Sequence, residues 1–66
     1  MTVKQICSML YDNQKIEIYN DRHSYEPVVW GAAQQFRNSN NSNGKYADAK
    51  VDVVVPSGKT ILIYLV

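Results

Sequence analysis

The last seven residues of the chain, Thr60 to Val66, carry almost no polar side chain. Successive side chains of a strand point to opposite sides. One side of this run would carry Ile61, Ile63 and Leu65, and the other Leu62, Tyr64 and Val66. A strand that is apolar on both sides is typical of a sheet interior. We therefore expect the rest of the chain to pack on or beside this segment.

The residues before this run alternate in polarity. Apolar side chains at every second position, separated by Lys50 and Asp52, are those of Ala49, Val51, Val53 and Val55. This period of two is typical of a half-buried strand. In the intervening Pro56-Ser57-Gly58-Lys59, proline presets φ and glycine supplies the positive φ of a tight turn. The two runs predict a C-terminal β-hairpin.

At the N-terminus, Thr2 and Gln5 have the spacing of a capping box, in which each side chain bonds to the other residue's backbone. Four apolar residues follow at helical spacing, namely Val3, Ile6, Cys7 and Leu10. The pattern predicts an amphipathic helix of about ten residues, ending at Asp12-Asn13. Such a helix is too short to be stable alone and must pack on the sheet.

The middle of the chain indicates two more extended segments. Gln14 to Asn20 alternates, with Ile16 and Ile18 on one side and a water-facing side that carries Lys15, Glu17 and Tyr19. After a polar turn comes Tyr25 to Trp30, which contains Pro27. Because proline cannot donate to a sheet, this run is expected to be an edge strand or an extended lead-in.

From Gly31 to Arg37 the residues are mostly helix formers, which predicts a second helix of about two turns. The following stretch, Asn38 to Gly44, is rich in Asn and Ser, whose side chains compete for backbone hydrogen bonds. We expect it to be the most mobile part of the chain.

These elements predict a single α+β domain over residues 1–66. Its sheet would be antiparallel or mixed, with three to four strands and two short helices on one face. The other face would carry Tyr19, Leu62 and Tyr64, with Val54 as a further candidate. An exposed apolar and aromatic strip favours a homodimer or a docked protein partner.

Composition excludes several functions. Seven Lys and Arg against six Asp and Glu leave a net charge of +1, without the basic footprint typical of nucleic-acid binding. With a single cysteine, Cys7, and a single histidine, His23, neither an intrachain disulfide nor a zinc site is expected, and no cofactor is indicated. Cys7 lies on the buried stripe, where a thiol is usually an inert core residue. A free thiol, with neither an export signal nor a membrane-length apolar run, favours the cytoplasm.

Two sequence features resemble catalytic motifs. Gly58-Lys59-Thr60 is similar to the end of a phosphate-binding loop, but position 53 is Val53 where that motif needs glycine, and a strand follows instead of a helix. His23 lies near Asp21 and Glu26 and could act as an acid or base. No nucleophile or oxyanion hole accompanies it, so we expect no enzymatic activity.

The aromatic residues are the better candidates for function. Tyr25 and Trp30 flank the edge segment close to Arg22, and Tyr, Trp and Arg are enriched at interface hot spots. Trp30 could instead cap the core at the start of the second helix, which is the more common role of a large aromatic residue in a small domain. The alternative is a partner-binding surface of Arg22, Tyr25 and Trp30, joined by Tyr19 and Tyr64 on the open sheet.

Two further hypotheses belong to other classes. In the first, Tyr19 and Tyr64 stack on nucleic-acid bases, while phosphates are contacted by Lys15, Arg22, Lys50 and Lys59. In the second, a small ligand is captured between subunits of an oligomer. The near-neutral charge argues against the nucleic-acid hypothesis.

The order of elements resembles a loose group of small proteins encoded by phages, prophages and other mobile elements of Gram-positive bacteria. The resemblance is carried by the helix ending at Leu10-Tyr11, the strand Lys15 to Asp21, the lead Val29 to Ala33 and the closing aliphatic hairpin. The Asn-rich stretch is longer than that pattern usually shows. The resemblance implies a bacterial cytoplasm, an accessory gene and the binding of a host factor. It transfers no functional residue.

Overall fold

The computed structural model describes residues 1–38 and 44–66. Its strands form one mixed sheet in the order β2-β1-β4-β3. They are β1 (Lys15–Tyr19), β2 (Val29–Ala32), β3 (Val51–Ser57) and β4 (Thr60–Leu65). β1 and β4 pair in parallel, whereas β2 with β1 and β3 with β4 pair antiparallel. The aliphatic C-terminal run therefore lies inside the sheet, with a strand on each side.

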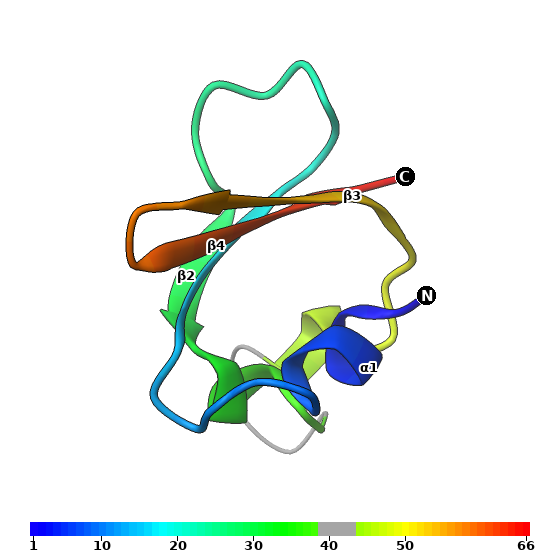
Figure 1. The fold of residues 1–66 in the computed structure, drawn as a ribbon. Coiled ribbons are helices and arrows are strands. Elements are labelled where there is room, and N and C mark those ends of the chain that lie inside the picture. Colours follow the sequence, from blue (N-terminus) through cyan, green and yellow to red (C-terminus); the bar gives the residue numbers. More distant parts are fainter. Residues whose placement is uncertain (39–43) are drawn as a thin grey trace.

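The helical elements lie together on one side of the sheet, which Figure 1 shows nearly edge-on. They are the α-helix α1 (Val3–Cys7) and the 3-10 helices η1 (Ala33–Phe36) and η2 (Gly44–Tyr46). The core between them and the sheet contains Val3, Ile6, Cys7, Ala33, Phe36, Ile16, Ile18, Ile63 and Leu65. The molecule is thus an α+β fold with one covered sheet face.

α1 begins as predicted and ends early. The Gln5 N–H donates to Thr2 Oγ1 at 3.4 Å and the Thr2 N–H donates to Gln5 Oε1 at 2.8 Å, which confirms the capping box. The prediction of about ten residues is wrong, because α1 ends at Cys7. Beyond it the chain tightens into shorter turns, in which the Leu10 N–H donates to the Cys7 carbonyl three residues back. Leu10 still packs against the core, so the apolar stripe continues past the helix.

Arg37 closes the end of α1 from a distant part of the chain. Its Nε donates to the Cys7 carbonyl at 3.1 Å and its Nη2 to the Leu10 carbonyl at 2.6 Å. Its Nη1 forms an ion pair with Asp12. The bond to Cys7 adds to the one that its carbonyl accepts from the Leu10 N–H, and the bond to Leu10 satisfies a carbonyl in the turns that follow α1.

The second helix is shorter than the sequence predicts. Gly31 and Ala32 belong to β2, where they pair with Ile16 and Lys15 of β1, so only the single 3-10 turn of η1 follows. Cross-strand pairing has overridden the helix propensity of these residues.

β2 lies at the edge of the sheet, and Pro27 lies in the segment that leads into it. It begins at Val29, later than the predicted Tyr25. Residues between β1 and β2 form a wide loop that projects on the side of the sheet away from α1 (Figure 1, cyan to green).

A bulge interrupts the alternation of β3. Val51 pairs with Leu65, but Val53 pairs with Tyr64, so the pairing advances two residues on β3 for one on β4. Asp52 is the extra residue, and a bulge of this kind re-aims the side chains that follow it.

The bulge corrects the predicted faces of β3. Val51 packs against the core, whereas Val53 and Val55 lie on the opposite face of the sheet. Val54 pairs with Ile63 and lies on the covered side, so it does not belong to the second face where we placed it as a candidate. Alternation in the sequence does not reveal where a strand inserts one residue.

Residues 39–43 of the Asn-rich stretch lie outside the described residues, so its predicted mobility is not addressed by the structure. Over the described ranges, none of the helices has the length and apolar character needed to cross a membrane.

Candidate functional site

The sheet face opposite α1 carries two rows of side chains set by the strand register. In one row Trp30, Glu17, Leu62 and Val55 are successive partners across the four strands, and in the other Tyr19, Tyr64 and Val53 are partners across three. Directly paired residues point to the same face. We call this surface the open face and define it by Glu17, Tyr19, Trp30, Val53, Val55, Leu62 and Tyr64.

Trp30 is a surface residue, with 64% of its area exposed. The interpretation that it caps the core is therefore wrong. Trp30 pairs with Glu17, which lies on the face away from the helices, while the neighbouring Val29 packs against the core. Because β2 is an edge strand, only one neighbouring strand flanks the indole.

Tyr19 and Tyr64 stack on each other near the ends of the two inner strands, β1 and β4. Their ring centroids are 4.7 Å apart and their planes differ by 17°. The Tyr19 hydroxyl donates to Glu17 Oε1 at 2.7 Å, and only 8% of the residue is exposed. The hydrogen bond to Glu17, followed by burial, raises the pKa of Tyr19 to about 12. Tyr19 belongs to the face that was predicted to be water-facing, but stacking on Tyr64 shields its side chain from water.

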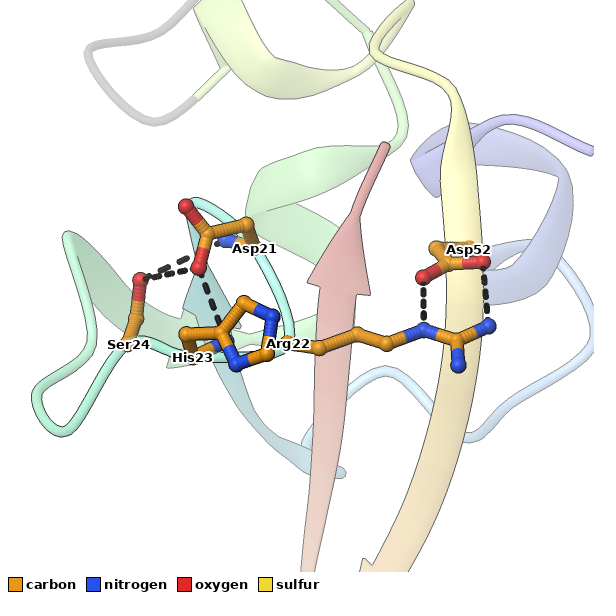
Figure 2. A network of polar contacts seen from close by, with 5 residues as sticks. All are labelled: Asp21, Arg22, His23, Ser24 and Asp52. Atoms are coloured by element: carbon orange, nitrogen blue, oxygen red, sulfur yellow. Dashed lines mark hydrogen bonds and ion pairs between the residues drawn. The ribbon is translucent and has the colours of Figure 1, made fainter.

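Arg22 ties the β1–β2 loop to β3. Figure 2 shows its side chain crossing β4 (red) to reach Asp52 on β3 (yellow). Its Nη2 donates to Asp52 Oδ1 at 3.0 Å, and its Nε donates to Oδ2. This two-point contact lowers the pKa of the Asp52 carboxyl and raises that of the Arg22 guanidinium. Both groups stay ionised near neutral pH.

A shallow depression of about 270 Å³ lies beside this ion pair and is open to solvent. Its lining comprises Val53, Val55, Tyr64 and Arg22. The floor is therefore apolar and aromatic, and the rim carries one cation. Such a combination of apolar surface with one polar anchor is typical of small binding sites.

The loop that carries Arg22 is organised by local bonds. The Asp21 carboxylate accepts from the His23 backbone N–H at 2.8 Å and from the Ser24 hydroxyl at 3.3 Å (Figure 2). The Asp21 backbone also bonds to Ser24, since its N–H donates to Ser24 Oγ and its carbonyl accepts from the Ser24 N–H, so Asp21 supports a turn. Tyr25, at the far side of this loop, is 98% exposed.

The predicted site residues do not form a single cluster. Tyr19 and Tyr64 are brought together, and Arg22 lines the depression beside Tyr64. Trp30 shares their face but lies on β2, at the edge opposite to β3 where Arg22 is bound. Tyr25 lies in the β1–β2 loop and is exposed, away from the stacked tyrosines.

Three residues of the depression and its ion pair were not among the predicted site residues. Val53 and Val55 reach the open face only because of the bulge, and Asp52 is the bulge residue that anchors Arg22. The one available signal was a carboxylate inside an otherwise valine-rich strand.

The described part of the chain holds no group of three or more His, Cys, Asp or Glu residues that could bind a metal ion. Cys7 is fully buried in the core, and this burial raises the pKa of its thiol to about 11. An activated thiol needs a lowered pKa and access to solvent, and Cys7 has neither.

Comparisons of the chain with protein-family models, curated proteins and solved structures found no match. The site is therefore interpreted from its own residues and their geometry.

Proposed function

We propose that this protein is a non-enzymatic interaction module that binds another protein through its open face. The observation that carries the proposal is the exposure of Trp30 beside an aromatic and apolar sheet face that the helical elements do not cover. Tryptophan and tyrosine are the residue types most enriched at interface hot spots.

The area of Trp30 that a partner would bury supports the proposal. A tryptophan side chain buries roughly 150–250 Å² when fully covered. Trp30 is 64% exposed, so a partner that covers it removes on the order of 100–150 Å² from water. At about 25 cal/mol per Å² the gross hydrophobic gain is about 3 kcal/mol, from which the costs of association are subtracted.

The proposed setting follows from the resemblance to small phage and mobile-element proteins. In that setting the protein is an accessory factor of the bacterial cytoplasm, and its partner is a host protein. A second copy of the chain is the other protein that could cover the open face.

Photo-cross-linking tests the proposal. We expect Trp30→p-benzoylphenylalanine to cross-link one defined protein when the variant is expressed in a bacterial host. Tyr11→p-benzoylphenylalanine is the matched control, because Tyr11 is also an exposed aromatic residue but precedes β1 and does not belong to the open face. Equal cross-linking from both positions, or none from position 30, would contradict the proposal.

The nucleic-acid hypothesis stays a prediction with less support. Tyr19 is already stacked on Tyr64 and is almost fully buried, so it offers little ring surface to a base. If single-stranded nucleic acid does bind, its affinity must fall steeply with salt, because phosphate contacts release counterions. An anisotropy titration at two salt concentrations distinguishes this from a protein interface.

A further inference from the structure

The depression on the open face has a feature that identifies the chemistry of its ligand. Arg22 carries five N–H donors, and its contact with Asp52 uses the one on Nε and one on Nη2. No residue that the structure describes accepts a hydrogen bond from Nη1. Three donors therefore remain, two of them along the Nη1/Nη2 edge of the guanidinium, and the Arg22 side chain is largely exposed.

Asp52 positions this free edge. Two-point contact with a carboxylate fixes both the position and the plane of a guanidinium. Figure 2 shows that the Arg22 side chain crosses β4 and that the ion pair lies at β3, with the third nitrogen of the guanidinium pointing away from Asp52. Arg22 also lines the depression together with Val53, Val55 and Tyr64. An oriented donor edge thus lies at the rim of an apolar floor.

The donor edge fits a planar acceptor with two oxygens, and a carboxylate matches it with two parallel hydrogen bonds. A phosphate fits the same edge but carries more negative charge. Asp52 already balances the charge of Arg22, and the depression has no second cation in its lining. The singly charged carboxylate is therefore favoured over the phosphate.

We propose that the depression binds a polypeptide segment in which a large apolar side chain lies next to a carboxylate. The apolar side chain would cover Val53, Val55 and Tyr64, and the carboxylate would accept hydrogen bonds from the free edge of Arg22. This inference rests on the proposed function, since it names the chemistry that the open face recognises in its protein partner. Because Arg22 is exposed and already paired, the carboxylate adds specificity more than affinity.

NMR titration of the isotope-labelled protein tests the inference with two matched peptides, acetyl-Phe-Asp-amide and acetyl-Phe-Asn-amide. We expect both to shift the backbone amide signals of Val53, Val55 and Tyr64, with the Asp peptide binding about two- to fivefold more tightly, as expected for an exposed ion pair. Arg22→Gln should remove this preference. Lys15→Gln, which removes a different exposed cation of the sheet, should keep it.

Equal affinity for the two peptides, or a preference that survives Arg22→Gln, would overturn the inference. Phenylacetate and phenyl phosphate identify the source of the anion. Binding of phenylacetate as tight as that of the Asp peptide would assign the site to small acids, and tighter binding of phenyl phosphate would assign it to phosphate ligands. Either result overturns the polypeptide assignment.

The cross-linking experiment and the peptide titration can contradict their proposals independently of each other. If position 30 cross-links a partner and the peptides show no preference, the open face binds protein but the assignment of the depression is wrong. If the Asp peptide is preferred and position 30 cross-links nothing, the depression is assigned correctly and the larger interface is not.

Discussion

Cys7 and Tyr19 show how burial in a small domain changes single side chains. Burial of Cys7 among apolar residues disfavours the charged thiolate and raises its pKa to about 11. Tyr19 keeps its proton mainly because its hydroxyl donates to Glu17, and its pKa rises to about 12. In both cases the fold favours the protonated, neutral form.

Cys7 is predicted to be unreactive while the protein is folded. Raising the thiol pKa from 9.0 to about 11 lowers the thiolate fraction at pH 8 about a hundredfold, and burial restricts access further. A chromogenic disulfide reagent should therefore modify the native protein at least about a hundredfold more slowly than the protein in denaturant. Modification at similar rates in both states would show that Cys7 is not in the core.

Tyr19 is predicted to make stability depend on pH in the alkaline range. Its pKa is 10.0 when unperturbed and about 12 in the fold, so its contribution is fully present below pH 10 and is lost as the pH rises toward 12. Denaturant unfolding of wild type and Tyr19→Phe at pH 8 and pH 11 measures this loss.

The difference in stability between wild type and Tyr19→Phe should shrink at pH 11. Tyr25→Phe is the control, because the exposed Tyr25 side chain should change stability equally little at both pH values. A difference that stays constant for Tyr19→Phe would exclude the bond to Glu17.

At the scale of elements, the start of α1 was predictable from the sequence, whereas its end and the start of η1 were not. Thr2 and Gln5 fixed the start of α1 because a capping box acts within four residues. Its end depends on Arg37, thirty positions after Cys7, and no local pattern contains that contact. Propensity likewise favoured helix at Gly31 and Ala32, but pairing with β1 overrode it.

The candidate site was also predictable only in part, because local patterns do not contain contacts between distant residues. Alternation placed Tyr19 and Tyr64 away from the core, and the register then stacked them. The positions of Val53 and Val55 depend on the bulge at Asp52, which is a property of the pairing with β4. The exposure of Trp30 depends on the place of β2 at the sheet edge and on the side to which the indole points.

Arg37 is predicted to matter for stability. Arg37→Gln removes two hydrogen bonds to the carbonyls of Cys7 and Leu10, both partly buried, and the ion pair with Asp12. The Cys7 carbonyl keeps the bond from the Leu10 N–H, but leaving the Leu10 carbonyl without its partner costs roughly 1–3 kcal/mol. Denaturant unfolding should show this loss. Arg22→Gln should show a smaller loss, because Arg22 forms its ion pair at the surface. Equal effects would contradict the role of Arg37 at the end of α1.

At the scale of the whole molecule, the structure favours association with another protein through the open face over association through the edge strands β2 and β3. The first part of β3 is covered by the N-terminus, where the Val51 N–H donates to the Met1 carbonyl at 2.8 Å. Further along, Pro56 has no N–H to offer, and the bulge at Asp52 distorts the edge. At the other side of the sheet β2 is only four residues long. Short, bulged or proline-containing edges discourage pairing between molecules.

Self-association through the open face is predicted to be weak. The open face is defined by seven residues, fewer than the roughly 20–30 residues per side of a standard interface. Sedimentation should therefore show a dimer that appears only as concentration rises and that Trp30→Ser abolishes. A clean monomer at tens of micromolar would count against the homodimer and would leave a different protein as the partner.

The most direct test of the account is quenching of Trp30 fluorescence by acrylamide in dilute protein, since Trp30 is the only tryptophan of the chain. If the helical elements cover one face of the sheet and the indole lies exposed on the other, the folded and unfolded chains should be quenched to nearly the same extent. Strong protection of the indole in the folded, dilute protein would place Trp30 in the core and would contradict the open face on which the proposed function depends.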